Sequence, residues 1–130
     1  MLKLVLILSA IYLAAVGAGL MLFPLRFGVG AVPADASPAL LALLRLLGGP
    51  FLGIAALNWL ARNAEPSMAR NAIIIANIVG FGAVAANDVH GVLSGEARDV
   101  AGIFLVIHLA FTAAFATLCI RMRRRRNGDA

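Results

Sequence analysis

The sequence predicts an all-α polytopic membrane protein: four antiparallel transmembrane helices in a compact bundle that forms one domain. Hydrophobic residues make up 62% of the 130 residues and charged residues only 13%, whereas a soluble domain carries about 25% charge. Four apolar runs fill most of the chain, each close to the ~20 residues that a helix needs to cross the ~30 Å hydrocarbon core. They cover residues 4–23, 38–61, 68–87 and 100–120.

The first run, residues 4–23, has only Ser9 and Tyr12 as polar interruptions. It therefore lacks the polar stripe of an amphipathic helix on a soluble core. Lys3 before an apolar stretch also fits a cleaved signal peptide, which is the alternative. The stretch continues to Phe23, longer than the usual signal core, so we expect an uncleaved span.

Local signals mark the ends of the other runs. Ser37 before Pro38 fits an N-cap followed by proline at the first helical position. Ser67 can cap the third run in the same way, and Gly91 and Gly95 predict that the chain leaves the helix after the third run. Pro50 removes one backbone donor inside the second run and predicts a kink there.

The charges predict which side of the membrane each end occupies. Lysine and arginine concentrate at the N-terminus, in the second connector and in the tail at 121–130, while acidic residues gather in the other connectors. Cytoplasmic loops carry such an excess of basic residues, so we expect a bacterial inner-membrane protein with both termini cytoplasmic. The tail has no interleaved aromatic residue, which favours anionic lipid over nucleic acid as its partner. The arginines expected to contact lipid are Arg121, Arg123, Arg124, Arg125 and Arg126.

Small residues recur at four-residue spacing, as in Gly49 and Gly53 or Ala76 and Gly80. Lipid tails are as apolar as leucine, so helices in a bilayer associate through close backbone approach and hydrogen bonds. The spacing predicts tight helix packing rather than a ligand site.

Four polar residues are expected to form an intramembrane cluster. Arg45 lies about 10 Å below the outer end of its run by helix rise, where an arginine costs ~2.5–3.5 kcal/mol, so it should avoid lipid. We expect Arg45, Asn77 and His108 to meet in the outer half of the bundle, with Asp88 paired to Arg45. The cluster is either a hydrogen-bond network that fixes helix register or a site for a small molecule or ion.

A second polar spot is predicted near the cytoplasmic end of the second run. Asn58 and Arg62 are four residues apart and share one helical face there.

Several chemistries are disfavoured. The single cysteine, Cys119, excludes an intramolecular disulfide or a CxxC pair. His90 and His108 differ in depth by roughly 10 Å by helix rise, which argues against a bis-histidine haem or a metal site. No carboxylate lies deep within the predicted runs, which argues against small proton-coupled drug exchangers. We predict no catalytic residue, metal or cofactor.

The second and third runs carry a resemblance. The segments Leu44–Arg62 and Arg70–Asn77, with an Arg-Leu-Leu-Gly start at Arg45 and an Asn-Trp before the turn, resemble a group of small uncharacterised bacterial four-helix integral membrane proteins. The resemblance implies the same fold and no catalytic residue.

The favoured interpretation is a non-enzymatic accessory or interaction protein in the lipid bilayer, which self-associates or binds another membrane protein. The alternative is a small-molecule or ion transporter, channel or lipid-binding protein that uses the polar site around Arg45 and His108.

Overall fold

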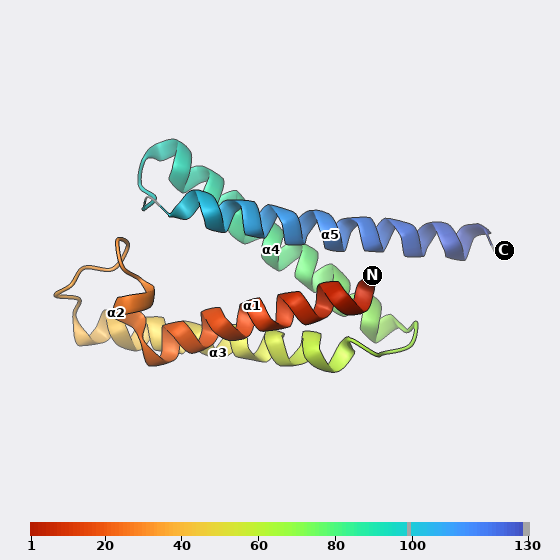
Figure 1. Ribbon diagram of the computed structural model, residues 1–130, viewed down its shortest axis with the longest axis horizontal. Coiled ribbons are helices and arrows are strands. Elements are labelled where there is room, and N and C mark those ends of the chain that lie inside the picture. Colours follow the sequence, from red (N-terminus) through yellow and green to blue (C-terminus); the bar gives the residue numbers. More distant parts are fainter. Residues whose placement is uncertain (99, 129–130) are drawn as a thin grey trace. The chain divides into compact units, whose positions relative to one another are not determined.

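The computed structural model is built from helices alone over the residues that it describes, 1–98 and 100–128, and the all-α prediction is confirmed (Figure 1). Side chains are described to Met122 and again at Arg124, so the expected lipid contacts of Arg123, Arg125 and Arg126 lie outside the described residues. The elements in chain order are α1 (Leu2–Leu22), α2 (Pro24–Phe27), α3 (Pro38–Ala61), α4 (Met68–Ser94) and α5 (Ala101–Gly128).

Four of these helices are long and apolar enough to cross a membrane. They are α1, α3, α4 and the part of α5 from Ala101 to Met122. Large apolar side chains such as Leu46, Leu60 and Val106 are exposed on them, as expected where lipid replaces water around a protein. The chain is therefore a multi-pass membrane protein by the length and composition of its helices.

The chain divides into two compact units. The N-terminal unit, Leu6–Arg62, contains most of α1 together with α2 and α3. The C-terminal unit contains Asn63–Ala130, hence α4 and α5, and also the first turn of α1 at Met1–Val5. The antiparallel order of all four helices stays a prediction, and each unit is described by itself below.

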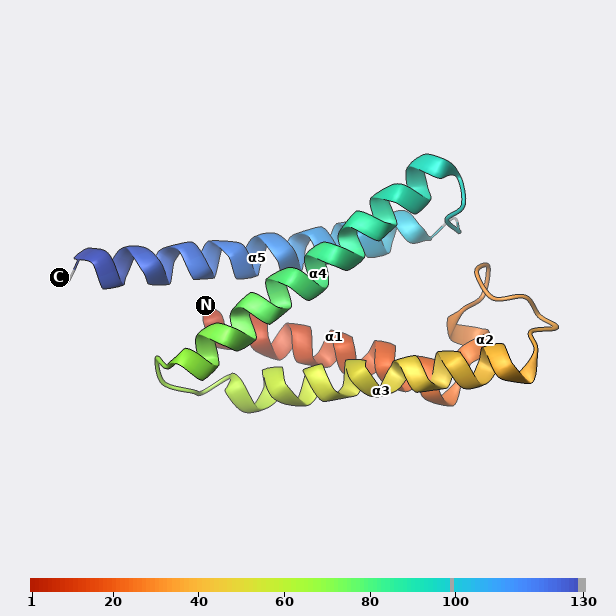
Figure 2. The same cartoon turned by 180° about the vertical axis from the view of Figure 1, so that it is seen from behind.

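In the N-terminal unit α1 and α3 approach each other through glycines. A Cβ placed on Gly48 would lie 2.6 Å from the carbonyl oxygen of Gly17 and 2.5 Å from Cγ of Met21. Further along the pair, Asn58 of α3 contacts Ser9 of α1. Contacts of later α3 residues with earlier α1 residues make the two helices antiparallel, as both views show (Figures 1 and 2).

In the C-terminal unit α4 and α5 form a hairpin around aromatic side chains. Phe81 of α4 stacks on Phe111 and Phe115 of α5, with ring centroids 4.7 and 6.1 Å apart. Phe115 is fully buried. Arg70, near the start of α4, contacts Met122 near the far end of α5, so these two helices are also antiparallel.

The helix caps follow the sequence, but two helices end later than predicted. Ser37 and Ser67 accept hydrogen bonds from the third residues of α3 and α4, both at 3.2 Å, which confirms them as N-caps. However, α4 continues from the predicted residue 87 to Ser94, and Gly95 ends it in the left-handed conformation with φ 74°. Packing on α5 overrides the weak helix propensity of this stretch. α5 likewise continues from residue 120 to 128 because arginine is a good helix former.

Candidate functional site

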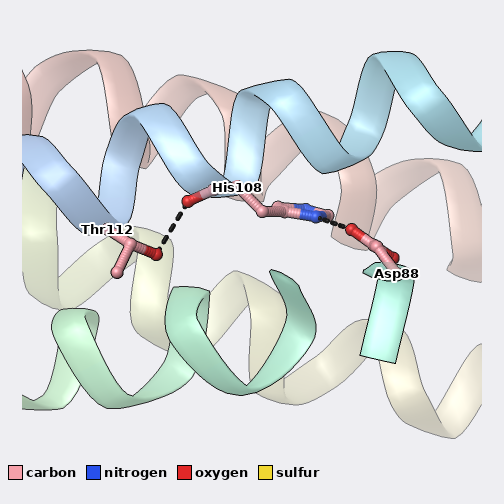
Figure 3. A network of polar contacts seen from close by, with 3 residues as sticks. All are labelled: Asp88, His108 and Thr112. Atoms are coloured by element: carbon pink, nitrogen blue, oxygen red, sulfur yellow. Dashed lines mark hydrogen bonds and ion pairs between the residues drawn. The ribbon is translucent and has the colours of Figure 1, made fainter. Parts of the chain in front are cut away.

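Asp88 and His108 form a close polar pair in the hairpin of the C-terminal unit. Nδ1 of His108 lies 2.5 Å from Oδ2 of Asp88. The two side chains are only 11% and 16% exposed, histidine first. Figure 3 shows the imidazole of α5 aimed at the carboxylate of α4, and the Thr112 hydroxyl on the other side of His108.

The pair is positioned by the antiparallel packing of α4 and α5. Asp88 lies six residues before the end of α4 at Ser94, and His108 lies seven residues after the start of α5 at Ala101. By helix rise, both sit about 10 Å from the connector between the helices. The sequence predicts no carboxylate deep within a span. Because α4 continues beyond residue 87, Asp88 lies inside the candidate span Met68–Ser94, six residues from its end.

Aromatic rings surround the imidazole. The centroids of Phe81 and Phe104 lie 6.1 and 6.4 Å from that of His108. Thr112 donates a hydrogen bond of 2.8 Å to the carbonyl oxygen of His108. On the connector side, the guanidinium of Arg98 lies 5.0 Å from the ring centroid of Phe104. Apolar walls strengthen the electrostatic attraction inside the pair because they exclude water.

The charge balance of the pair determines what chemistry it can perform. With one proton shared between imidazole and carboxylate, the pair has no net charge whichever group carries that proton. A second proton makes the pair cationic, and loss of the first makes it anionic. Both changes place a net charge in apolar surroundings, which is costly. Because a carboxylate and an imidazole both exchange protons, the pair can serve as a proton-binding site, but any net charge on it costs free energy.

Of the other members of the expected cluster, Asn77 shares the unit of the pair and Arg45 belongs to the other unit. Asn77 is buried on α4 and donates a 2.8 Å hydrogen bond to the carbonyl of Ile73. It precedes Asp88 by eleven residues, about 16 Å along the helix axis, so it does not share the depth of the pair. Arg45 belongs to the N-terminal unit and is exposed. Asp88 was expected to pair with Arg45 but pairs with His108. Whether Arg45 also approaches this pair stays a prediction.

Asn58 of α3 and Arg62, which caps the end of that helix, have partners that the sequence did not predict. Asn58 is fully buried, and its Nδ2 donates a 3.0 Å hydrogen bond to Oγ of Ser9. Arg62 donates to the carbonyl of Trp59 and places its guanidinium 4.1 Å from the indole centroid. Ser9 was missed because one hydroxyl in an apolar run gives no functional signal. Its position, on the same helical face as Leu6 and Leu13, is the only cue that it is buried.

Among the residues that the structure describes, no group of three or more histidine, cysteine, aspartate or glutamate side chains is arranged to hold a metal ion. Cys119 is a half-buried free thiol.

Comparison with known proteins gives no relative: no family model, no curated protein and no solved structure matches this chain. The likeness of the Leu44–Arg62 segment to small bacterial membrane proteins stays a prediction.

Proposed function

We propose that this chain is a small proton-linked membrane transporter or channel, without enzymatic activity of its own, in which Asp88 and His108 bind the transported or coupling proton. One observation carries the proposal: a carboxylate and an imidazole meet at 2.5 Å within candidate membrane spans, inside an aromatic shell. Ionisable groups at such depth are rare and mark ion pathways and proton relays.

Two features support this choice over a purely structural pair. A register-fixing hydrogen bond between helices can be formed by uncharged side chains, as Asn58 and Ser9 do in the N-terminal unit. A carboxylate and an imidazole add an exchangeable proton to that role. His90, two residues after Asp88, is exposed and offers a second imidazole between the pair and the connector.

The test is proton flux into liposomes that contain the full-length chain, a trapped pH-sensitive dye and a potassium gradient opened by valinomycin. We expect acidification above that of protein-free liposomes. Asp88→Asn keeps the shape and a hydrogen bond but removes the carboxylate, and should lower the flux at least about tenfold. Asp88→Glu should recover part of it.

Thr112→Val is the matched control. It removes the hydroxyl one turn from His108, whose described bond goes to the backbone, and should leave the flux unchanged. Circular dichroism in the same liposomes checks that each variant is helical. Equal flux from wild type and Asp88→Asn would refute the proposal, and no flux from the wild-type chain would exclude a proton channel or an uncoupled proton transporter.

A second candidate is the accessory role predicted from sequence, through self-association of α3. A Cβ on Gly49 or Gly53 would meet nothing within 4 Å, so α1 does not account for these two glycines as it does for Gly48. Small residues at this spacing allow another helix to approach closely. Cross-linking in membranes should give a dimer that Gly53→Leu abolishes, with Leu43→Ala as a control at an exposed position on another face of α3. A monomer in wild type would exclude this role.

The proposed location is the bacterial inner membrane with both termini in the cytoplasm. The support is the distribution of basic residues: Lys3 precedes the first span, Arg62 and Arg70 flank the second connector, and five arginines follow residue 120.

A further inference from the structure

A cavity of about 700 Å³ opens in the C-terminal unit at the end opposite the Asp88–His108 pair. It lies where α4 begins and the span of α5 ends, next to the first turn of α1. Its chemistry is divided between apolar side chains and guanidinium groups. It is lined by Met1, Leu2, Pro66, Arg70, Leu118, Arg121, Met122 and Arg124.

Arg70 is the residue that suggests a ligand. Its Nη1 donates a 3.1 Å hydrogen bond to the carbonyl of Ala64, and its Nη2 lies 3.8 Å from the sulfur of Met122, a weak acceptor. Its Nε is buried and has no hydrogen-bond partner. A buried donor without an acceptor costs about 1–3 kcal/mol. Arg70 also lines the cavity, so an anionic oxygen bound there is the acceptor that this donor lacks, provided that the side chain rotates to meet it.

The charge of the cavity also favours an anion. Three arginines line it and no lining residue is acidic. Among the described residues, none of these three guanidinium groups forms an ion pair with a carboxylate. The hydrogen bond described for the Arg121 side chain goes to a weak acceptor, the sulfur of Met1, at 3.6 Å. Planar guanidinium groups bind phosphate through paired N–H donors, so this cavity is suited to a phosphate group.

The position and the apolar lining identify the source of that phosphate. Met122 ends the candidate span of α5, and Arg70 is the third residue of α4, so the arginines lie at the level of the lipid head groups. Leu118, one turn deeper than Met122, is only 6% exposed and continues the cavity wall toward the hydrocarbon. A free phosphate ion needs no such apolar wall, whereas the glycerol and first methylenes of a phospholipid do.

We propose that this cavity is a specific site for an anionic phospholipid, whose phosphate is held by Arg70 and Arg121 with Arg124 at the rim. The site is independent of the Asp88–His108 pair, and it is a defined pocket rather than a diffuse attraction of the basic tail to a charged surface. The bound lipid would link α4 to the end of α5 and fix this end of the hairpin.

The test is native mass spectrometry of the full-length chain in detergent, titrated with dioleoylphosphatidylglycerol or dioleoylphosphatidylcholine. We expect one phosphatidylglycerol to bind at least about tenfold more tightly than phosphatidylcholine. Arg121→Gln should weaken phosphatidylglycerol binding about fivefold, which corresponds to about 1 kcal/mol per arginine. Arg70→Gln should weaken phosphatidylglycerol binding by about tenfold or more, because the substitution removes both a positive charge and the unpartnered Nε donor from the site.

Arg26→Gln is the control, because Arg26 is an exposed arginine of the N-terminal unit and its loss lowers the net charge equally. It should leave lipid binding unchanged. Equal loss of binding from Arg26→Gln and Arg121→Gln, or equal binding of the two lipids, overturns the site. If millimolar inorganic phosphate displaces the lipid completely, the cavity binds free phosphate and the assignment to a phospholipid is wrong. Arg121→Gln keeps the test valid if Arg70→Gln fails to fold.

Discussion

Asn58 illustrates how a single polar residue is accommodated in this protein. Its amide is fully buried and donates to the hydroxyl of Ser9, which in turn donates to the carbonyl of Leu6 at 3.1 Å. The chain of donors satisfies one buried side chain on each helix without any net charge. Such bonds between membrane helices contribute about 0.6 kcal/mol on average and up to about 1.7. The main effect of this bond is therefore to fix the register of α3 against α1, and its contribution to stability is small.

Ser9→Ala is therefore expected to lower the free energy of unfolding by about 0.6–1.7 kcal/mol, because the amide of Asn58 loses an acceptor. The measurement is reversible unfolding in mixed micelles titrated with sodium dodecyl sulfate, followed by circular dichroism. Ser94→Ala, which removes an exposed hydroxyl bonded to the carbonyl of Gly91, should change nothing measurable. Identical curves for the two variants would show that the Asn58–Ser9 bond contributes nothing.

The Asp88–His108 pair differs from the Asn58–Ser9 bond in the chemistry of its side chains. Both link two helices through buried side chains, but only the first contains groups that exchange a proton. A neutral hydrogen bond would suffice to align α4 with α5. The use of two ionisable groups in candidate spans is the reason that the proposed function rests on this pair.

Among the elements, α3 shows most clearly how one helix can have two different glycine faces. Gly48 packs against the backbone of Gly17, whereas its neighbour Gly49 has nothing within 4 Å. The same residue type thus has opposite roles at adjacent positions. The sequence spacing predicted tight packing at Gly49 and Gly53, but within the N-terminal unit the close approach occurs at Gly48.

The paired substitutions Gly48→Ala and Gly49→Ala test this difference. The Cβ at residue 48 would clash with the carbonyl of Gly17 and with Met21, so we expect a loss of about 1–3 kcal/mol from forced separation of the helices. Alanine at residue 49 should be neutral or stabilise the helix by up to about 1 kcal/mol. Unfolding in mixed micelles measures both, and a larger loss at residue 49 would contradict the observed face of α3.

For the whole molecule, four candidate spans and the distribution of charge together predict the topology. An even number of crossings returns the chain to its starting side, and the basic residues at both ends predict that this side is the cytoplasm.

We expect a fluorescent protein fused to either terminus to fluoresce in bacterial cells, and alkaline phosphatase fused there to be inactive. The phosphatase inserted between residues 28 and 36 should be active, since that connector is predicted to lie on the opposite side. Active phosphatase at one terminus only would mean an odd number of crossings and would contradict this topology.

Local sequence signals are enough to predict the four membrane-length helices and the residues at which two of them begin. Transfer of a helix into lipid depends on its length and apolar composition, and a cap such as Ser37 or Ser67 acts within three residues. Helical periodicity predicts that Asn58 and Arg62 share one helical face, but it could not supply Ser9 as the partner of Asn58.

Which polar residues meet depends on how the helices pack, and the sequence alone did not predict it. Asp88 and His108 are 20 residues apart, and Ser9 and Asn58 are 49 apart. Their pairing depends on the rotation and register of one helix against another, which side chains of both helices set together at contacts such as Gly17 on Gly48. A helical wheel predicts the face on which a residue lies but not the depth at which its partner lies on another helix. For that reason the sequence could not show that His108 meets Asp88 and not Asn77.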